Sequence, residues 1–319
     1  MKQISIEIIQ KCPNKCVHCS SCSDIDKTKK ISTDEVMKVV DSAALLETEV
    51  LSISGGEPFL HSGLVEIVQY AKAKGIKVYI YTSGVGLNRG HAACAIDLDK
   101  LECLKAAGTD KLIFDFPAMD EAVYNEFMGT EGHQKFALES IFRSKKSGIY
   151  TEIHFVPTKI NIDQIEKVLS FAERNQIDKV SFLGLVPHGR AKENREKIYL
   201  SSQENALLKM RLHQLEGDGV RIGIPLQSVD SEYQCYAGRN KLCIRYDGKV
   251  FGCEAFKYMA LLDADGKKIN PDSIYCKDLT DIFNHSVYLE YERKLVEGML
   301  GKCGCNEKCP VQKLMRKAI

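Results

Sequence analysis

The sequence Cys-Pro-Asn-Lys-Cys-Val-His-Cys at positions 12–19 places three cysteines in a CxxxCxxC spacing near the start of the chain. It directly follows Gln3–Gln10, where isoleucine alternates with polar residues, a pattern that predicts a β-strand. Three thiolates on one short loop can hold three corners of a [4Fe–4S] cluster and leave the fourth iron without a protein ligand. A zinc ion or a ferredoxin-type cluster would also use thiolates. Zinc sites, however, usually combine two CxxC-like pairs, and bacterial ferredoxins place the longer gap last, so the spacing favours an open cluster.

The number and distribution of the cysteines point the same way. The chain has 13 cysteines in 319 residues: four within positions 12–22, seven between positions 235 and 309, and two in the long stretch between. The N-terminus lacks the apolar segment of a signal peptide, so we expect a cytoplasmic protein, where disulfides are rare and clustered cysteines more often bind metal. The formal net charge of +1 argues against a nucleic-acid partner, and no apolar run is long enough for a membrane span.

Predicted strands and helices alternate between the two cysteine groups. Two of the helices begin with a capping box, formed by Ser32 with Glu35 and by Ser201 with Glu204. Such alternation indicates an α/β fold of parallel βα units, although periodicity does not distinguish a partly closed barrel from an open sheet. In either case the loops after the strands form the active face. The six predicted strands are Gln3–Gln10, Glu49–Ser54, Lys77–Thr82, Lys111–Phe116, Tyr150–Val156 and Lys179–Val186.

A second motif, Gly55-Gly56-Glu57-Pro58, follows the second predicted strand. Together with the CxxxCxxC loop after the first strand, it resembles the radical S-adenosylmethionine (radical SAM) superfamily. His18 departs from the family pattern, because an aromatic residue often precedes the third cysteine. The resemblance implies a partial (β/α)6 TIM-like barrel over residues 1–224. It also implies a [4Fe–4S] cluster whose open iron binds SAM, and one-electron cleavage of SAM to a 5′-deoxyadenosyl radical that abstracts a substrate hydrogen.

The resemblance also assigns roles to individual residues. Cys12, Cys16 and Cys19 would hold the cluster. The glycines of the second motif would let backbone carbonyls approach the cofactor, while Glu57 would either support its amino group or brace the turn. For Arg190 a solvent-facing position is an alternative, and for His154 a structural partner. The residues expected to bind the cofactor are Gly55, Gly56, Glu57, Pro58, Thr82, Ser83, Asp115, His154 and Arg190.

The second cysteine region begins with a predicted hairpin. Cys235–Cys253 contains alternating residues on both sides of Asp247-Gly248, a strong type I′ turn signal. The region 225–319 resembles the small C-terminal extension called SPASM, or its shorter twitch form. The resemblance implies one auxiliary [4Fe–4S] cluster, with a structural zinc or two clusters as alternatives, the latter needing Cys243 and Cys276. The implied ligands are Cys235, Cys253, Cys309 and either Cys303 or Cys305.

Cys243 is left over by this assignment. In related enzymes a free thiol donates a hydrogen atom to the substrate radical, so Cys243 is a candidate catalytic residue. A free cysteine is also among the most often buried residues, so simple packing is the alternative.

The family resemblance narrows the substrate to two classes. Enzymes with this extension often modify ribosomally made peptides by crosslinking, epimerisation or oxidation, and others oxidise or epimerise sugar-like or nucleoside-like small molecules. The cluster motif begins at residue 12. We therefore expect no leader-binding domain before it, and a peptide substrate would use a separate recognition protein or bind through the barrel and the C-terminal extension. A flavodoxin or ferredoxin is the expected electron donor. A non-catalytic iron–sulfur electron carrier is a further alternative, against which the second motif argues.

Overall fold

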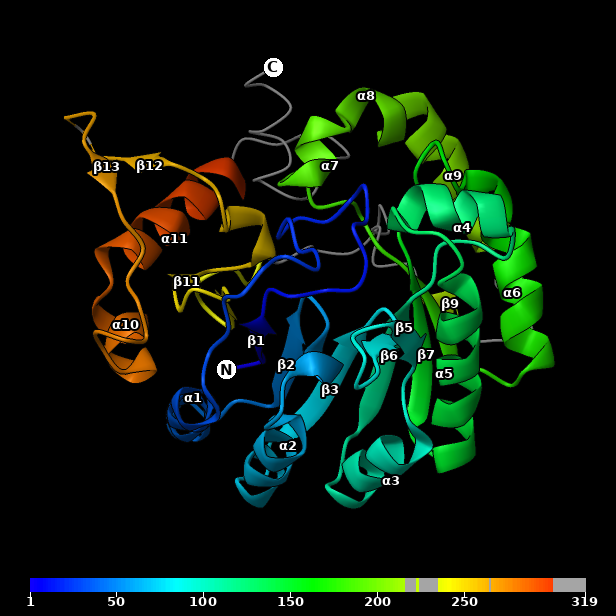
Figure 1. Ribbon diagram of the computed structural model, residues 1–319. Helices are drawn as coiled ribbons and strands as arrows, with labels where there is room; N and C mark the ends of the chain where they lie inside the picture. Colours follow the sequence, from blue (N-terminus) through cyan, green and yellow to red (C-terminus); the bar gives the residue numbers. More distant parts are fainter. Residues whose placement is uncertain (216–221, 224–234, 264, 301–319) are drawn as a thin grey trace.

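A twisted, mostly parallel sheet forms the centre of the computed structural model (Figure 1). The structure describes residues 1–215, 222–223, 235–263 and 265–300. Eight strands are parallel, in the order β10-β1-β2-β3-β6-β7-β8-β9, and β11 joins β10 in antiparallel orientation. Their bounds are β1 Gln3–Ile9, β2 Val50–Gly55, β3 Lys77–Thr82, β6 Lys111–Asp115, β7 Tyr150–Phe155, β8 Lys179–Phe182, β9 Ile222–Gly223, β10 Lys241–Ile244 and β11 Val250–Phe251.

All six strands predicted from the sequence are present, and they lie side by side in chain order. Within the described residues the two outer strands, β9 and β11, do not pair with each other. The sheet therefore curls without closing. The expected α/β fold, a partial TIM-like barrel, is confirmed.

Helices cover the outer face of the sheet (Figure 1). Ser32 accepts a hydrogen bond from the backbone N–H of Glu35, and Ser201 and Glu204 form a reciprocal capping box, so both predicted helix starts are confirmed. Helix α4 (Glu121–Met128), whose N-cap is Asp120, was not predicted from the sequence, and neither were the two short helices after β8 or the last two helices of the described chain. Apart from α4, the helices are α1 Thr33–Leu45, α2 Leu64–Ala73, α3 Leu98–Ala106, α5 Gln134–Ser147, α6 Ile165–Arg174, α7 Arg190–Glu193, α8 Arg195–Ile198, α9 Ser202–Gln214, α10 Leu279–His285 and α11 Val287–Leu300.

Several short elements complete the described chain. They are the hairpins β4 Val85–Leu87 with β5 Ala93–Ala95 and β12 Leu261–Leu262 with β13 Lys268–Ile269, and the 3-10 turns η1 Pro58–Leu60, η2 Ile162–Gln164 and η3 Glu254–Phe256. None of the helices among the described residues is both long and apolar enough to cross a bilayer.

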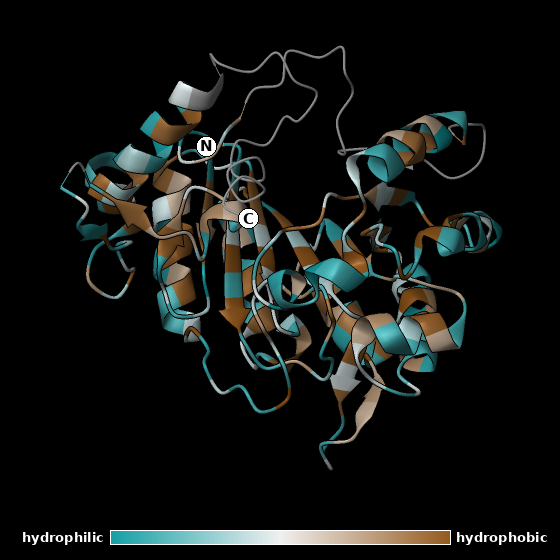
Figure 2. Ribbon diagram, turned by 90° about the horizontal axis from the view of Figure 1, so that it is seen from above, coloured by the Kyte–Doolittle hydropathy of each residue, from teal (hydrophilic) through white to brown (hydrophobic). Residues whose placement is uncertain are grey.

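The two faces of the sheet differ in polarity because successive side chains of a strand point to opposite sides. In β1, Ile4, Ile6 and Ile8 are fully buried in the main apolar core, which also contains helix residues such as Val36 and Ile67. The residues between them are polar, and the same alternation continues in β2, β3, β7 and β8. Figure 2 shows that the surrounding helices also carry both hydrophobic and hydrophilic residues. The inner face of the barrel is therefore mostly polar, with Ile113 of β6 as an apolar residue among the polar ones.

The predicted C-terminal hairpin is present and extends this sheet. Strands β10 and β11 pair around the Asp247-Gly248 turn, but the predicted type I′ turn is wrong. Gly248 has a φ of +78° whereas the φ of Asp247 is not positive, and the Gly248 N–H donates to the Arg245 carbonyl. Strand β10 also pairs in parallel with β1, with Cys243 opposite Ser5. Because β10 adds to the edge of the barrel sheet, the extension lies directly beside the strand that precedes the first cysteine group.

Candidate active site

The cysteine loop runs over the ends of the first strands and is held on one side by α4 (Figure 1). The backbone N–H groups of Lys15 and Val17 donate to the carbonyls of Met128 and Phe127, at 3.0 and 2.9 Å. Gly129 ends α4 with a φ of +64°, and a Cβ atom there would lie 2.3 Å from the Lys15 carbonyl oxygen. The last turn of α4 therefore fixes the first half of the loop.

On its other side the loop is held by the segment after β8. The Arg190 guanidinium donates to the carbonyl oxygens of Cys16 at 2.8 Å and Ser23 at 2.6 Å, and its backbone N–H donates to Cys19. Asn194 also donates to the Val17 carbonyl. In this structure Arg190 therefore stabilises the loop, and a direct contact of Arg190 with a cofactor stays a prediction.

The glycines of the second motif pack against the chain that enters this loop. A Cβ atom on Gly55 would lie 2.2 Å from the Ile9 carbonyl oxygen, and one on Gly56 would lie 2.1 Å from the Lys11 carbonyl oxygen. The backbone N–H groups of Gly56 and Glu57 donate to the same two carbonyls. Glycine is needed at these positions because two backbone segments touch there.

Glu57 is fully buried and anchors the turn to the end of β3. Its Oε1 accepts from the Thr82 hydroxyl at 2.7 Å and from the Phe59 N–H, and its Oε2 accepts from the N–H and hydroxyl of Ser83 at 2.9 and 2.6 Å. Burial raises the pKa of Glu57, while the hydrogen bonds from Ser83 and Thr82 oppose this rise. Of the two roles expected for Glu57, bracing the turn is the one that these contacts describe.

His18 and Asp115 form a polar pair beside the loop. His18 Nε2 lies 3.2 Å from Asp115 Oδ2 at the end of β6, and the His18 ring lies 4.5 Å from that of Phe127, centroid to centroid. Ligand atoms of Cys16, His18 and Asp115 all lie within 4.8 Å of one another. Among the described residues, His18 Nδ1 and Asp115 Oδ1 are buried without a hydrogen-bond partner. A bound molecule could supply the hydrogen-bond partners that these two atoms lack.

The three thiols of the loop have surroundings that call for a metal centre. Burial, and then Glu57, raises the pKa of Cys12; burial, and then Cys12 and Asp115, raises that of Cys16. Thiolates in such surroundings need a positively charged centre, so the donor set fits an iron–sulfur cluster.

A second polar group lies deeper on the inner face. His154 pairs in register with Asp115, and its Nε2 lies 3.3 Å from Glu152 Oε1 on the same strand. Glu152 Oε1 also accepts from the Ser181 hydroxyl at 2.6 Å, and its Oε2 accepts from Lys111 at 3.3 Å. Sequence patterns did not single out Glu152, because its position in a strand resembles that of any solvent-facing carboxylate.

The cysteines of the C-terminal region are only partly within the described residues. Cys235 and Cys243 are buried, and Cys253 is half-buried. Cys303, Cys305 and Cys309 lie outside the described residues. Cys243 belongs to a small apolar cluster with Phe251 and Phe256. This surrounding agrees with the packing alternative for Cys243, and hydrogen-atom donation stays a prediction.

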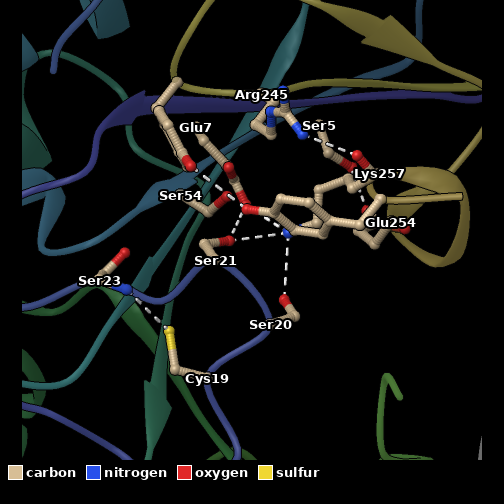
Figure 3. Close-up of polar contacts among 12 residues, drawn as sticks. Ser5, Glu7, Cys19, Ser20, Ser21, Ser23, Ser54, Arg245, Glu254 and Lys257 are labelled. Carbon is tan, nitrogen blue, oxygen red and sulfur yellow. Dashed lines mark hydrogen bonds and ion pairs between the residues drawn. The ribbon is translucent and has the colours of Figure 1, made fainter. Parts of the chain in front are cut away.

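A buried ion pair joins this region to the cysteine loop (Figure 3). Lys257, just after η3, donates to Glu7 Oε1 at 2.5 Å, Ser21 Oγ at 2.8 Å and Ser20 Oγ at 3.1 Å. Nearby, Glu254 accepts from Ser5 and pairs with Lys241 at 2.8 Å. These contacts could not be predicted from the sequence, because no local motif connects residues that lie so far apart in the chain.

Fold and site together define an open α/β barrel with a thiol loop at the carboxyl ends of its strands. Residues 6–172 match the Radical SAM superfamily, and the chain belongs to this superfamily. Membership implies a [4Fe–4S] cluster and SAM.

Individual relatives agree with this assignment. Fe-coproporphyrin III synthase of Methanosarcina barkeri is 28% identical over 200 residues, which cover 62% of this chain and 48% of that protein. The chain thus spans about half the length of this curated relative. Streptococcus suis SuiB, solved with its precursor peptide SuiA, has a similar fold at a TM-score of 0.71 and 18% identity, covering 97% of this chain and 73% of SuiB. The enzyme anSMEcpe with bound AdoMet gives 0.66 and 15%, covering 92% and 82%.

Proposed function

We propose that this radical SAM enzyme modifies a ribosomally synthesised peptide by a crosslink, an epimerisation or an oxidation. The observation that carries the proposal is the polar inner face of an unclosed barrel. A peptide presents N–H and C=O groups that need polar partners once they leave water. The inner face carries polar groups in His154, Ser181 and Lys111, each of which contacts Glu152 in this structure. The similar fold of SuiB, which was solved with a precursor peptide, supports this substrate class.

In this proposal Cys12, Cys16 and Cys19 hold the catalytic [4Fe–4S] cluster. When bound with SAM, the cluster supplies the electron that cleaves SAM to a 5′-deoxyadenosyl radical. The chain keeps the three thiols in place through α4, Arg190 and the glycines of the second motif. Rigid placement matters because small displacements of reacting groups reduce rates strongly.

The residues around the loop would bind and orient SAM. Asp115 and His18 have the unpartnered buried atoms for polar contacts, and Thr82 and Ser83 define the neighbouring turn through Glu57. His154, one strand from Asp115, would contact the substrate or SAM from the inner face. Of the residues in this proposed cofactor site, His18 was not expected from the sequence to bind the cofactor.

We further propose that residues 225–319 form a unit with an auxiliary [4Fe–4S] cluster. Cys235 and Cys253 would be two of its ligands, and the remaining ligands would come from Cys303, Cys305 and Cys309. Iron analysis of a Cys12/Cys16/Cys19→Ala variant tests the stoichiometry. About four remaining irons indicate one auxiliary cluster, about eight indicate two, and none contradicts the proposal.

A small-molecule substrate is the second candidate. The Methanosarcina barkeri relative is named for a tetrapyrrole product, which favours a small organic substrate over a peptide. Superfamily membership, in contrast, disfavours the non-catalytic electron carrier. A flavodoxin-type or ferredoxin-type donor, and a separate peptide-recognition protein, stay predictions.

Anaerobic reconstitution and assay for 5′-deoxyadenosine test the catalytic proposal, with the Cys12/Cys16/Cys19→Ala variant as control. No cleavage of SAM under dithionite would contradict it. The substrate class is tested with two deuterated probes: a short peptide encoded beside the gene, and a coproporphyrin-type tetrapyrrole. Deuterium transfer into 5′-deoxyadenosine from the peptide supports the first candidate, and transfer from the tetrapyrrole alone supports the second.

A further inference from the structure

Lys257 lies at a junction of three chain segments that are distant in sequence. Its ammonium group has three N–H donors, and all three are used, by Glu7 of β1 and by Ser20 and Ser21 of the cysteine loop. Ser21 in turn donates to Glu7 Oε1 at 2.5 Å, so Lys257, Glu7 and Ser21 all contact one another, and Ser20 joins them through Lys257 (Figure 3). Lys257 is 3% exposed and Glu7 5%.

The junction connects the two cysteine regions directly. Ser20 follows Cys19, a proposed ligand of the catalytic cluster. Lys257 follows Cys253, a proposed auxiliary ligand, by four residues and one 3-10 turn. Burial alone would lower the pKa of Lys257, but the adjacent Glu7 raises it, so the amine stays charged. A buried charge that loses its partner is strongly unfavourable, which ties the segments together.

We propose that Lys257 is a positioning residue: through Ser20, Ser21 and Glu7 it fixes the Cys19 end of the cysteine loop against the C-terminal extension. The proposal rests on the proposed function only in taking Cys19 as a cluster ligand. The loop would then keep its geometry only while the extension is docked. The same ion pair would also set the electrostatic potential next to the cluster, because charges interact strongly in a buried environment.

The chain offers clean variants that separate charge from contact. Glu7 Oε2 is buried and has no partner among the described residues, so the amide nitrogen of Glu7→Gln can occupy that position without facing another donor. Lys257→Met removes the opposite charge and leaves Glu7 unpaired. The double variant Glu7→Gln/Lys257→Met has no unpaired charge, so it should still fold if Lys257→Met alone is too unstable to measure. Ser20→Ala/Ser21→Ala keeps both charges and removes only the contacts with the loop.

The first measurement is hydrogen–deuterium exchange of the whole chain, both reconstituted and metal-free. Lys257→Met, the double charge variant and Ser20→Ala/Ser21→Ala should each speed exchange at least several-fold in residues 19–23. Lys145→Met, which breaks the Lys145–Asp178 pair elsewhere on the barrel, is the matched control and should leave residues 19–23 unchanged. Unchanged exchange there in all three junction variants would overturn the proposal.

The second measurement is a redox titration of the cluster whose EPR signal shifts on addition of SAM. Lys257→Met should lower its midpoint potential, Glu7→Gln should raise it, and the double variant should return close to wild type. A purely structural role gives no such opposite shifts, so shifts of the same sign, or none, would contradict the electrostatic part. A wild-type protein without any SAM-sensitive signal would instead refute the proposed function. The exchange results on metal-free protein would still show whether Lys257 holds residues 19–23 in place.

Discussion

Ser83 donates two hydrogen bonds to the buried carboxylate of Glu57, one from its backbone N–H at 2.9 Å and one from its hydroxyl at 2.6 Å. This contact joins the turn after β2 to the turn after β3. It converts a recognisable sequence motif into a rigid support for the cysteine loop, because the neighbouring Gly56 packs on the Lys11 backbone.

Replacing Glu57 by Gln should weaken this support. The amide nitrogen would face a donor on either side, since Oε1 and Oε2 both accept hydrogen bonds. Loss of a buried charge-assisted hydrogen bond costs about 2 kcal/mol, and we expect that decrease in the free energy of unfolding. SAM affinity should fall at least tenfold. Urea denaturation and SAM titration measure both effects. Glu66→Gln, on the exposed face of α2, is the control; an equal loss there would refute the argument.

Gly56→Ala should prevent the cysteine loop from closing. The new Cβ atom would lie 2.1 Å from the Lys11 carbonyl oxygen, a backbone atom that cannot move aside alone. We expect the iron bound after reconstitution to fall by more than half, and stability to drop by about 1–3 kcal/mol, as for other overpacked sites. Iron analysis and thermal unfolding test this. Gly298→Ala is the matched control, because its Cβ atom would meet nothing within 4 Å. Full iron content in Gly56→Ala would contradict the close contact.

Glu152 should make stability depend on acid pH. Burial would raise its pKa, but His154, Ser181 and Lys179 together lower it from 4.5 to about 2. Between about pH 2 and 4.5, Glu152 is therefore ionised in the folded protein but protonated in the unfolded one. The stabilisation is complete above about pH 5 and is lost as pH falls through about 2. It amounts to about 3 kcal/mol when fully present, of which about 1 kcal/mol is lost by pH 3.5.

Urea denaturation of metal-free wild type and Glu152→Gln at pH 7 and pH 3.5 tests this dependence. The stability difference between the two proteins should shrink at the lower pH. Glu131→Gln, at an exposed position, should show no such convergence. A constant difference for Glu152→Gln would disprove the assignment.

Cys243 should be chemically inert in the folded protein. It is 1% exposed, and burial, followed by Glu254, raises the pKa of its thiol. Little thiolate forms near neutral pH, and thiolate is the reactive species. Iodoacetamide at pH 8 should therefore label the exposed Cys103 long before Cys243, and urea should abolish this order. Peptide mass spectrometry reads the labelling. Rapid labelling of folded protein at Cys243 would favour an accessible, hydrogen-donating thiol over a packed one.

Local patterns explain why much of the barrel could be predicted. The alternation in Gln3–Gln10 and the capping boxes at Ser32 and Ser201 depend on residues a few positions apart, and strand and helix periodicity is visible at that range. Helix α4 was missed, because Val123 stands three residues after its N-cap Asp120, where Ser32 and Ser201 are each followed by a glutamate. That helix supplies two of the carbonyls that hold the cysteine loop.

The sequence by itself determined the chemistry: the spacing of Cys12, Cys16 and Cys19, and the glycine turn one βα unit later, are local and therefore readable. Tertiary structure alone decided how the loop is held. Lys257 meets Glu7 across 250 positions of sequence, and Arg190 reaches the Cys16 carbonyl across 174. Such contacts depend on the order of the strands in the sheet and on which polar side chains become buried and therefore need a partner. Both are properties of the whole fold, so no local sequence pattern predicts them.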